Sequence, residues 1–222
     1  SVRNKSIAGY AHLAWKTDRF ELAGGLRYTK DNRRETIRAG GLRPFVLPAA
    51  TFDASGDHWD FDATATYVVN PNVRIYARFA TGYLSGGVVG GLPFKAETTK
   101  SYELGFKGDL IDRTLRLNAA LFHSRRRNVQ TLAFTAEAGT FILSAPRAEE
   151  TGFELALTAL PTKGLTFNAS LGYLDTKLSA DPVRGPVNSL APRYTLSVGG
   201  QYDFPHFAND SYLSFRIDGF FG

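Results

Sequence analysis

The sequence contains many segments, each about ten residues long, in which apolar and polar side chains alternate strictly. Between Trp59 and Tyr67, one set of alternate positions is aromatic or alanine, whereas the other set holds only Asp60, Asp62 and threonine. Successive side chains of a β-strand point to opposite faces, so this pattern predicts a strand with one apolar and one polar face. Residues 73–83 repeat the pattern after Asn70-Pro71-Asn72, which predicts a tight turn.

The same alternation predicts ten strands joined by links of two lengths. Short links are expected at 17–18, 70–72, 110–113 and 161–164, a moderate one at 206–210, and long ones at 31–57, 85–98, 126–149 and 177–191. Short turns on one side and long loops on the other are typical of bacterial outer-membrane barrels. The predicted strands are 6–16, 19–30, 58–69, 73–84, 99–109, 114–125, 150–160, 164–176, 192–203 and 211–221.

The two faces of these strands differ sharply in polarity. The apolar positions, from Ile7 and Leu13 to Phe215 and Ile217, contain no charged residue among them, and small residues fill the gaps. The opposite face holds more charge than a buried core tolerates without pairing, so it is expected to meet water or a polar plug. Its candidate lumen-facing residues are Glu21, Arg27, Arg74, Arg78, Glu103, Lys107, Arg116 and Glu154. They could line a substrate route, but charge ladders that hold strand register are the favoured interpretation of these residues.

Aromatic residues fall at both ends of the apolar bands, which predicts two girdles at membrane–water interfaces rather than a general strand preference. Candidates beside the short turns are Trp15, Phe20, Tyr67 and Tyr202, and those beside the long loops are Tyr28, Trp59, Tyr83, Tyr102, Tyr173 and Tyr194.

Composition excludes several function classes. The chain has no cysteine, which rules out disulfides, thiolate metal sites and cysteine nucleophiles. No apolar run approaches the ~18 residues of a membrane-spanning helix. The net charge of +5 is spread along the chain, so no nucleic-acid partner is expected. The four histidines lack metal-ligand spacing, although Asp57 and Asp60 flank His58, and no Gly-x-Ser-x-Gly occurs. We therefore predict no catalytic residue, metal or cofactor.

Two glycine- or arginine-rich stretches need separate interpretation. The stretch from Gly82 to Gly91 lacks a following Gly-Lys-Ser/Thr, so it is better explained as a flexible extracellular loop than as a phosphate-binding loop. Arg125, Arg126 and Arg127 open a predicted loop that Arg147 closes. These four cations are candidates for attracting an anionic ligand such as a ferric siderophore or phosphate-bearing lipopolysaccharide, although a solvated basic loop is the simpler and favoured interpretation.

Several stretches resemble the TonB-dependent outer-membrane receptors. The resemblance rests on Y-A-R-F-A-T-G-Y-L-S-G-G at 76–87, F-K-A-E-T-T-K-S-Y-E-L-G-F-K at 94–107, T-L-R-L-N-A-A-L-F at 114–122 and E-T-G-F-E-L-A-L-T-A-L-P-T-K-G-L-T-F-N-A-S-L-G-Y at 150–173. It covers most of the chain from about residue 6. It implies a barrel of about 22 strands, closed by a plug and energised by TonB, which takes up siderophore-iron or another scarce nutrient.

The chain departs from that pattern because it shows about ten strands and no plug or TonB-contacting segment. The first predicted strand runs towards a short turn, and an even number of antiparallel strands returns the chain to its starting side, so both ends are expected on the long-loop side. Residues 1–222 are therefore predicted to form one all-β, antiparallel, up-and-down transmembrane barrel segment, with outer-membrane lipid, the remaining strands and the plug as partners, unless the chain was redesigned or is incompletely represented. The alternatives are a passive outer-membrane channel, porin-like or engineered, and a soluble carbohydrate-binding β-sandwich.

Overall fold

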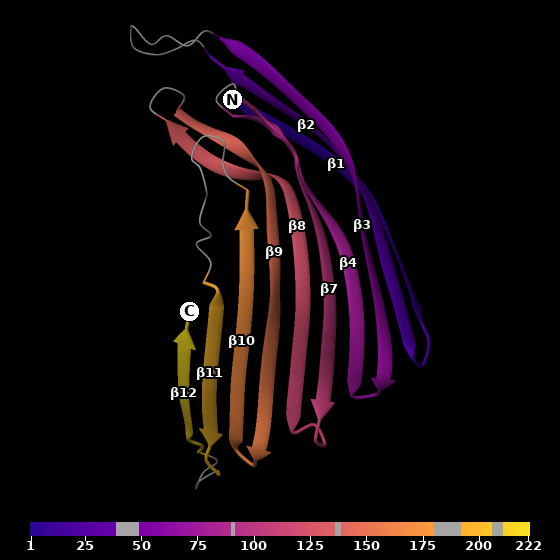
Figure 1. Cartoon of the computed structure of the whole chain (residues 1–222), viewed down its shortest axis with the longest axis vertical. Helices are drawn as coiled ribbons and strands as arrows, with labels where there is room; N and C mark the ends of the chain where they lie inside the picture. The colour runs from indigo at the N-terminus through magenta and orange to yellow at the C-terminus, as the bar shows by residue number, and fades with distance from the viewer. Residues whose placement is uncertain (39–48, 90–91, 136–138, 180–191, 206–210) are drawn as a thin grey trace.

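The computed structural model describes residues 1–38, 49–89, 92–135, 139–179, 192–205 and 211–222. Nearly all of them belong to one antiparallel sheet of ten strands, in which each strand pairs with the next along the main sheet (Figure 1). These strands are β1 (Val2–Lys16), β2 (Phe20–Ile37), β3 (Ala50–Asn70), β4 (Val73–Leu84), β7 (Glu97–Leu110), β8 (Leu115–Thr135), β9 (Gly139–Thr162), β10 (Leu165–Leu178), β11 (Tyr194–Asp203) and β12 (Ser214–Phe221). The expected all-β, up-and-down fold class is confirmed.

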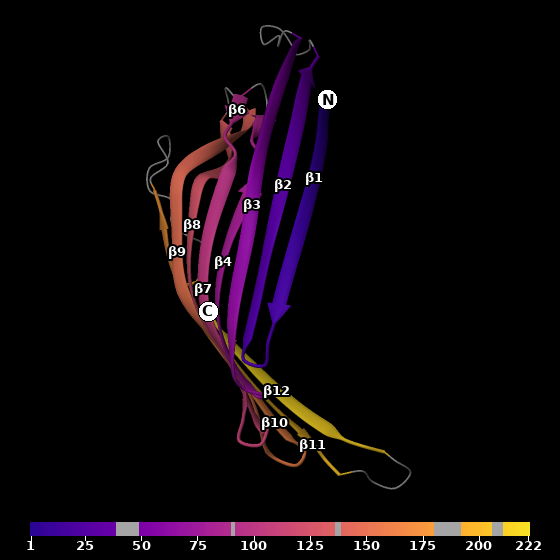
Figure 2. The same ribbon diagram turned by 90° about the vertical axis from the view of Figure 1, so that its right-hand side faces the viewer.

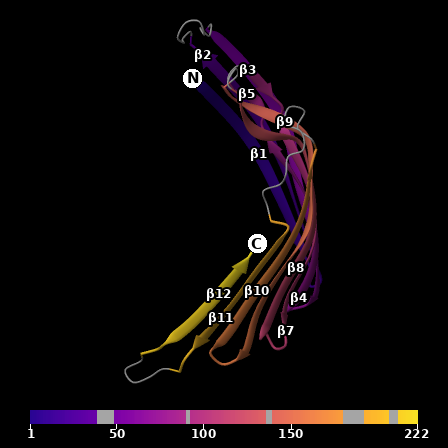
Figure 3. The same ribbon diagram turned by 60° about the vertical axis from the view of Figure 1, so that its left-hand side comes forward.

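The sheet is strongly curved but open in the described residues. Its order begins at β1 and ends at β12, and no pairing joins these two strands. Figures 2 and 3 show the resulting trough, with the first and last strands on separate sides. β1 pairs only with β2 and β12 only with β11, so each presents an unpaired backbone edge, and all their residues are exposed. The described residues contain no helix long and apolar enough to cross a membrane.

The faces of the sheet are inverted relative to a soluble sandwich. Outward apolar side chains are open, with Trp59 at 53% exposure, Leu104 at 52% and Phe215 at 63%. No second layer covers them among the described residues, whereas the side chain of Asp60 on the other face is only 17% exposed. A sandwich would require the apolar faces to meet in a core, so this geometry contradicts that alternative and agrees with a wall facing lipid.

The polar face lines the concave side of the trough. A small hairpin, β5 (Gly87–Val89) and β6 (Leu92–Phe94), lies inside the curve, where β5 is labelled in Figure 3. The ring of Phe94 lies 5.5 Å from the guanidinium carbon of Arg33, a β2 residue of the polar set. Val88 and Phe94 are buried there at 5% and 8% exposure. In the stretch predicted as a flexible loop at 82–91, residues 82–84 therefore continue β4 and residues 87–89 form β5 of this hairpin, while residues 90–91 lie outside the described residues.

Strand positions were predicted well, but several strands were predicted too short at their long-loop ends. β8 continues ten residues beyond the predicted end at 125, to Thr135, and β9 begins at Gly139 rather than at 150. β2 and β3 similarly extend to Ile37 and from Ala50. The alternation of apolar residues stops where lipid contact stops, whereas backbone pairing continues into water. The predicted link at 206–210 lies outside the described residues.

Candidate functional site

The concave inner face is the candidate functional surface. Strand alternation places every predicted lumen-facing residue on it. The register pairs Arg74 with Lys107 and Arg78 with Glu103, whereas the other residues pair with further positions of the same face. The residues are Glu21 and Arg27 on β2, Arg74 and Arg78 on β4, Glu103 and Lys107 on β7, Arg116 on β8 and Glu154 on β9. The structure shows that these residues share one face. Their contact with a transported ligand stays a prediction.

Two of these charges, Glu21 and Arg116, form cross-strand ion pairs. Lys16 and Glu21 are register partners, with Nζ 2.7 Å from Oε1. Arg116 donates from Nε to Oδ1 of Asp109 across β7 and β8 at 2.7 Å. Such opposite-charge pairs stabilise strand register, so they favour the ladder interpretation for Glu21 and Arg116.

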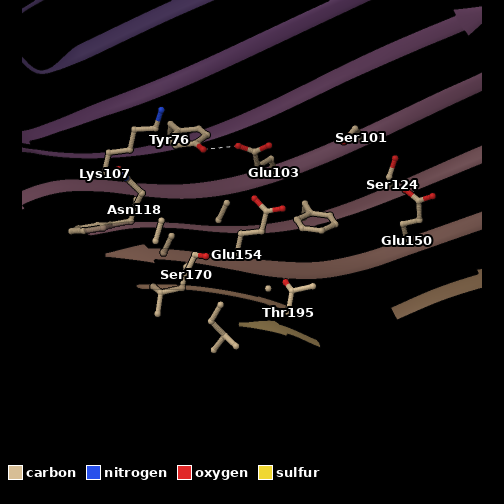
Figure 4. A pocket seen from close by; sticks show the side chains of 18 residues that line it. Tyr76, Ser101, Glu103, Lys107, Asn118, Ser124, Glu150, Glu154, Ser170 and Thr195 are labelled. Atoms are coloured by element: carbon tan, nitrogen blue, oxygen red, sulfur yellow. Dashed lines mark hydrogen bonds between the residues drawn. The ribbon is translucent and has the colours of Figure 1, made fainter. Parts of the chain in front are cut away.

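A polar hollow of 740 Å³ occupies the centre of the inner face (Figure 4). Tyr76 reaches over it from β4 and donates its hydroxyl hydrogen to Oε1 of Glu103 at 2.5 Å. The Lys107 ammonium lies 5.5 Å from the centre of the same ring. The hollow is lined by apolar side chains such as Phe122, Leu155 and Leu171, and by acidic, hydroxyl and amide groups, including those of Ser101, Asn118, Ser124, Glu150, Glu154, Ser170 and Thr195.

Glycine makes the position of Tyr76 possible. A Cβ added to Gly105, which faces Tyr76 directly across β4 and β7, would lie only 2.2 Å from the ring carbon Cζ. The ring therefore lies flat against the backbone of β7, and its hydroxyl meets Glu103 on the same strand. The hollow therefore presents hydrogen-bonding groups beside apolar side chains, and among them Tyr76 and Glu103 hold each other in place.

A buried cluster holds the β5–β6 hairpin against the inner face. Glu97 is 5% exposed, and its carboxylate accepts hydrogen bonds from Arg126 Nε at 2.8 Å and from the Gln130 backbone N–H at 2.8 Å. The Gln130 side-chain amide donates to the carbonyls of Ser85 at 3.0 Å and Lys95 at 3.1 Å. These bonds fix both ends of the segment that carries the hairpin. Sequence reasoning missed Glu97 and Gln130, because no local motif marks them.

Replacing Glu97 with Gln is expected to loosen the hairpin. The variant keeps the side-chain volume but loses a charge-assisted bond of about 1.5–3 kcal/mol, so amide exchange in residues 87–89 and 92–94 should accelerate about tenfold or more. Hydrogen–deuterium exchange measures this change. Glu103→Gln is the matched control, since Glu103 lies on the same strand and face but contacts Tyr76. Unchanged hairpin exchange in Glu97→Gln would contradict the assigned role.

The arginines predicted to open a loop lie in a regular strand and divide between its faces. Arg126 faces inward, with Nη2 2.5 Å from Oε1 of Glu97 and Nη1 3.6 Å from Oε1 of Glu150. Arg125 and Arg127 face outward, as does Arg147 opposite them on β9, since they alternate with Arg126 along paired strands. The structure therefore separates Arg126 from the other three. Ligand contact by the four stays a prediction.

Most of the predicted interfacial aromatics form rows on the outward face. On the long-loop side the rings of Tyr28 and Trp59 lie 4.8 Å apart, and Tyr173 lies 5.0 Å from Tyr194. Tyr102 packs 5.0 Å from Phe79 in the same band. The short-turn side carries the remaining candidates, namely Trp15 on β1, Phe20 paired with Tyr67 at 5.2 Å, and Tyr202 on β11.

Tyr83 differs from this pattern. Its ring stacks on His58 at 4.6 Å, and His58 belongs to the inner face of β3, where its Nε2 lies 3.6 Å from Oδ1 of Asp60. The pairing of β3 with β4 ends at Asp62 and Ala80, which leaves room for Tyr83 to turn towards β3. In the described part of the chain, no three His, Asp or Glu side chains gather as metal ligands would.

Comparison with known proteins gives one consistent result. Residues 1–221 match the family model described as TonB dependent receptor-like, beta-barrel. The chain is 32% identical over 161 residues to the pesticin receptor of Yersinia enterocolitica, which covers 68% of this chain and 23% of that protein. It is 25% identical over 175 residues to the probable TonB-dependent siderophore receptor PiuA of Acinetobacter baumannii, covering 73% of this chain and 22% of that receptor.

Solved structures agree on the fold. The ferric yersiniabactin uptake receptor FyuA from Yersinia pestis superposes with a TM-score of 0.77 at 23% identity, over 91% of this chain and 32% of that one. The copper transporter OprC superposes with a TM-score of 0.75 at 16% identity, over 98% of this chain and 38% of that one. The chain thus spans about a quarter to two fifths of the length of these proteins.

Proposed function

Since this chain belongs to the β-barrel family of the TonB-dependent receptors, a family of outer-membrane proteins, we propose that it forms part of the barrel wall of a receptor that imports a scarce nutrient. The observation that carries this proposal is the inverted sheet, apolar and exposed outside, charged and concave inside. Such a wall places a polar conduit within lipid.

The substrate class that we propose is siderophore-bound iron or a comparable metal complex. The relatives support this class, because they include a ferric yersiniabactin uptake receptor and a probable siderophore receptor. The relatives are receptors and transporters, and we propose binding and gated passage without any bond made or broken in the substrate.

The partners follow from the shape of the wall. The open edges at β1 and β12 call for further strands to close the barrel, because unpaired backbone groups are not tolerated in lipid. The polar hollow around Tyr76 and Glu103 supplies hydrogen-bonding groups for a plug domain. In this proposal the plug receives energy from TonB, so transport needs all three parts.

Uptake of radioactive iron tests the proposal. Cells lacking the complete receptor are given ferric siderophores one at a time, with and without the restored receptor. We expect at least one siderophore to enter only when both the receptor and TonB are present. Equal uptake without TonB would instead indicate a passive channel and would overturn the proposal.

A further inference from the structure

The outward face carries a band of positive charge directly beyond its aromatic row on the long-loop side. Lys100 lies two residues beyond Tyr102 on β7, and Lys177 lies four residues beyond Tyr173 on β10. Strand register joins these positions, because Lys100 pairs with Arg125, Arg125 with Glu149, and Glu149 with Lys177. We call this set the outer basic belt: Lys100, Arg125, Arg127, Arg147, Lys177 and Arg193.

The outer basic belt has too few carboxylates to neutralise it among the described residues. Arg125 and Arg147 share Glu149, with Arg125 Nε 3.1 Å from Oε1. The hydrogen bond from Arg147 holds the pKa of Glu149 below its ordinary value, and Arg125 adds to this effect. Lys177 and Arg193 in turn share Asp175, at 3.9 Å and 3.2 Å.

The remaining cations have no acidic neighbour in the described part of the chain. Arg127 lies directly opposite Arg147 in the register of β8 and β9, and like charges in this position are destabilising unless an anion lies between them. The side chains are open to such an anion, with exposures of 56% for Arg125, 54% for Arg147 and 64% for Arg193. Six cations thus face outward around two carboxylates.

The position of the belt identifies its surroundings. Tyrosine rows mark the headgroup level of a membrane, and the belt begins two residues beyond Tyr102 and four residues beyond Tyr173, away from the apolar band. The guanidinium of Arg193 lies over Tyr173, 5.8 Å from the ring centre, which ties the cation directly to the aromatic row. The belt also faces away from the lumen, because Arg126 between Arg125 and Arg127 points inward to Glu97.

The opposite rim of the wall lacks such a band. Outward positions near the short turns are aromatic or aliphatic, as at Trp15, Phe20, Tyr67, Leu110 and Leu165. Of the cations on that side, Arg19, Arg113 and Lys163 lie in the turns. The others are on the inner face of the strands, among them Lys16, Arg74, Arg116 and Arg216. The positive charge on the membrane-facing wall therefore belongs to one leaflet, the one on the long-loop side.

We propose that the outer basic belt binds the phosphate groups of lipopolysaccharide in the surrounding outer leaflet. This inference rests on the membrane placement in the proposed function. Guanidinium groups match phosphate oxygens in two-point hydrogen bonds, and clustered Lys and Arg near a charged membrane surface each strengthen binding. A phosphate between Arg127 and Arg147 would also remove their mutual repulsion.

Lipid retention by the complete receptor tests the proposal. The triple variant Arg125→Gln, Arg127→Gln, Arg147→Gln is compared with a control of equal net charge, Arg19→Gln, Arg113→Gln, Lys163→Gln. Each receptor is purified from outer membranes, and bound lipid A is counted by native mass spectrometry. The belt variant is expected to bind lipid A about 10- to 100-fold more weakly, while the control behaves as the unaltered receptor.

A second arm separates phosphate recognition from acyl-chain contact. Lipid A stripped of its phosphates is added to the unaltered receptor in detergent, and we expect its binding to fall to the level of the belt variant with intact lipid A. Equal binding of the two lipids, or equal loss in both triple variants, would overturn the proposal. Lipid retention is independent of iron uptake, so failure of the import proposal would be distinguishable from failure here.

Discussion

Replacing Ala119 with Arg in the complete receptor is expected to destabilise the barrel by about 2–4 kcal/mol. Ala119 lies on the outward face of β8, between Phe106 and Leu155 in neighbouring strands and midway along the apolar band. An arginine there would place its guanidinium in hydrocarbon, far from either interface. Denaturant unfolding of the receptor in phospholipid vesicles measures the effect.

Ala120→Arg is the matched control, since it adds the same side chain at the next residue of the same strand. Ala120 faces inward, directly opposite Glu154, which can pair with the new cation. We expect its free energy of unfolding to remain within about 1 kcal/mol of the unaltered receptor, as for other exposed charge pairs. Equal destabilisation by both variants would mean that the faces are wrongly assigned.

The second large effect concerns the two open edges. The chain of 222 residues expressed alone is expected not to insert as a folded barrel, because β1 and β12 would place unpaired N–H and C=O groups in lipid at several kcal/mol each. Supplying the remaining receptor strands as a second polypeptide should restore folding. Electrophoresis of unheated samples measures the fraction of folded barrel, which migrates apart from unfolded chain.

A folded species from this chain alone, with ion conductance across a planar bilayer, would give the opposite result. It would show that β1 can pair with β12 after a change in curvature, and it would favour the passive-channel alternative. The relevant control is Ala119→Arg in the same chain, which should abolish insertion whether or not the edges close.

The sequence predicted the membrane-spanning part of the wall because alternation is a local signal. Each residue between Trp59 and Tyr67 has its face decided by parity alone, and the structure keeps that parity. The same alternation would have assigned Arg126 to one face and Arg125 and Arg127 to the other, but the adjacency of the three arginines favoured their prediction as one loop cluster. The structure places them in β8, because strand pairing continues past the point where the apolar residues end.

Contacts between distant segments could not be predicted in the same way. Glu97 meets Gln130 only because β7 and β8 pair and Asn128, with a φ of 53°, interrupts the regular path of β8. Nothing near Glu97 in the sequence marks it as buried. The β5–β6 hairpin could not be predicted either, because its glycines suggested a flexible loop. Its contact with Arg33 joins residues more than fifty positions apart in the sequence.

The great length of β3 has a consequence for the cell surface. Trp59 and Tyr67 belong to the two aromatic rows, so residues 50–58 of this 21-residue strand lie beyond the row on the long-loop side. At about 3.3 Å per residue and a tilt near 45°, this part rises about 20 Å beyond that row. Together with β2 it reaches the top of Figure 2. The raised ends of β2 and β3 are therefore accessible to an antibody or a bacteriophage that approaches the cell from outside.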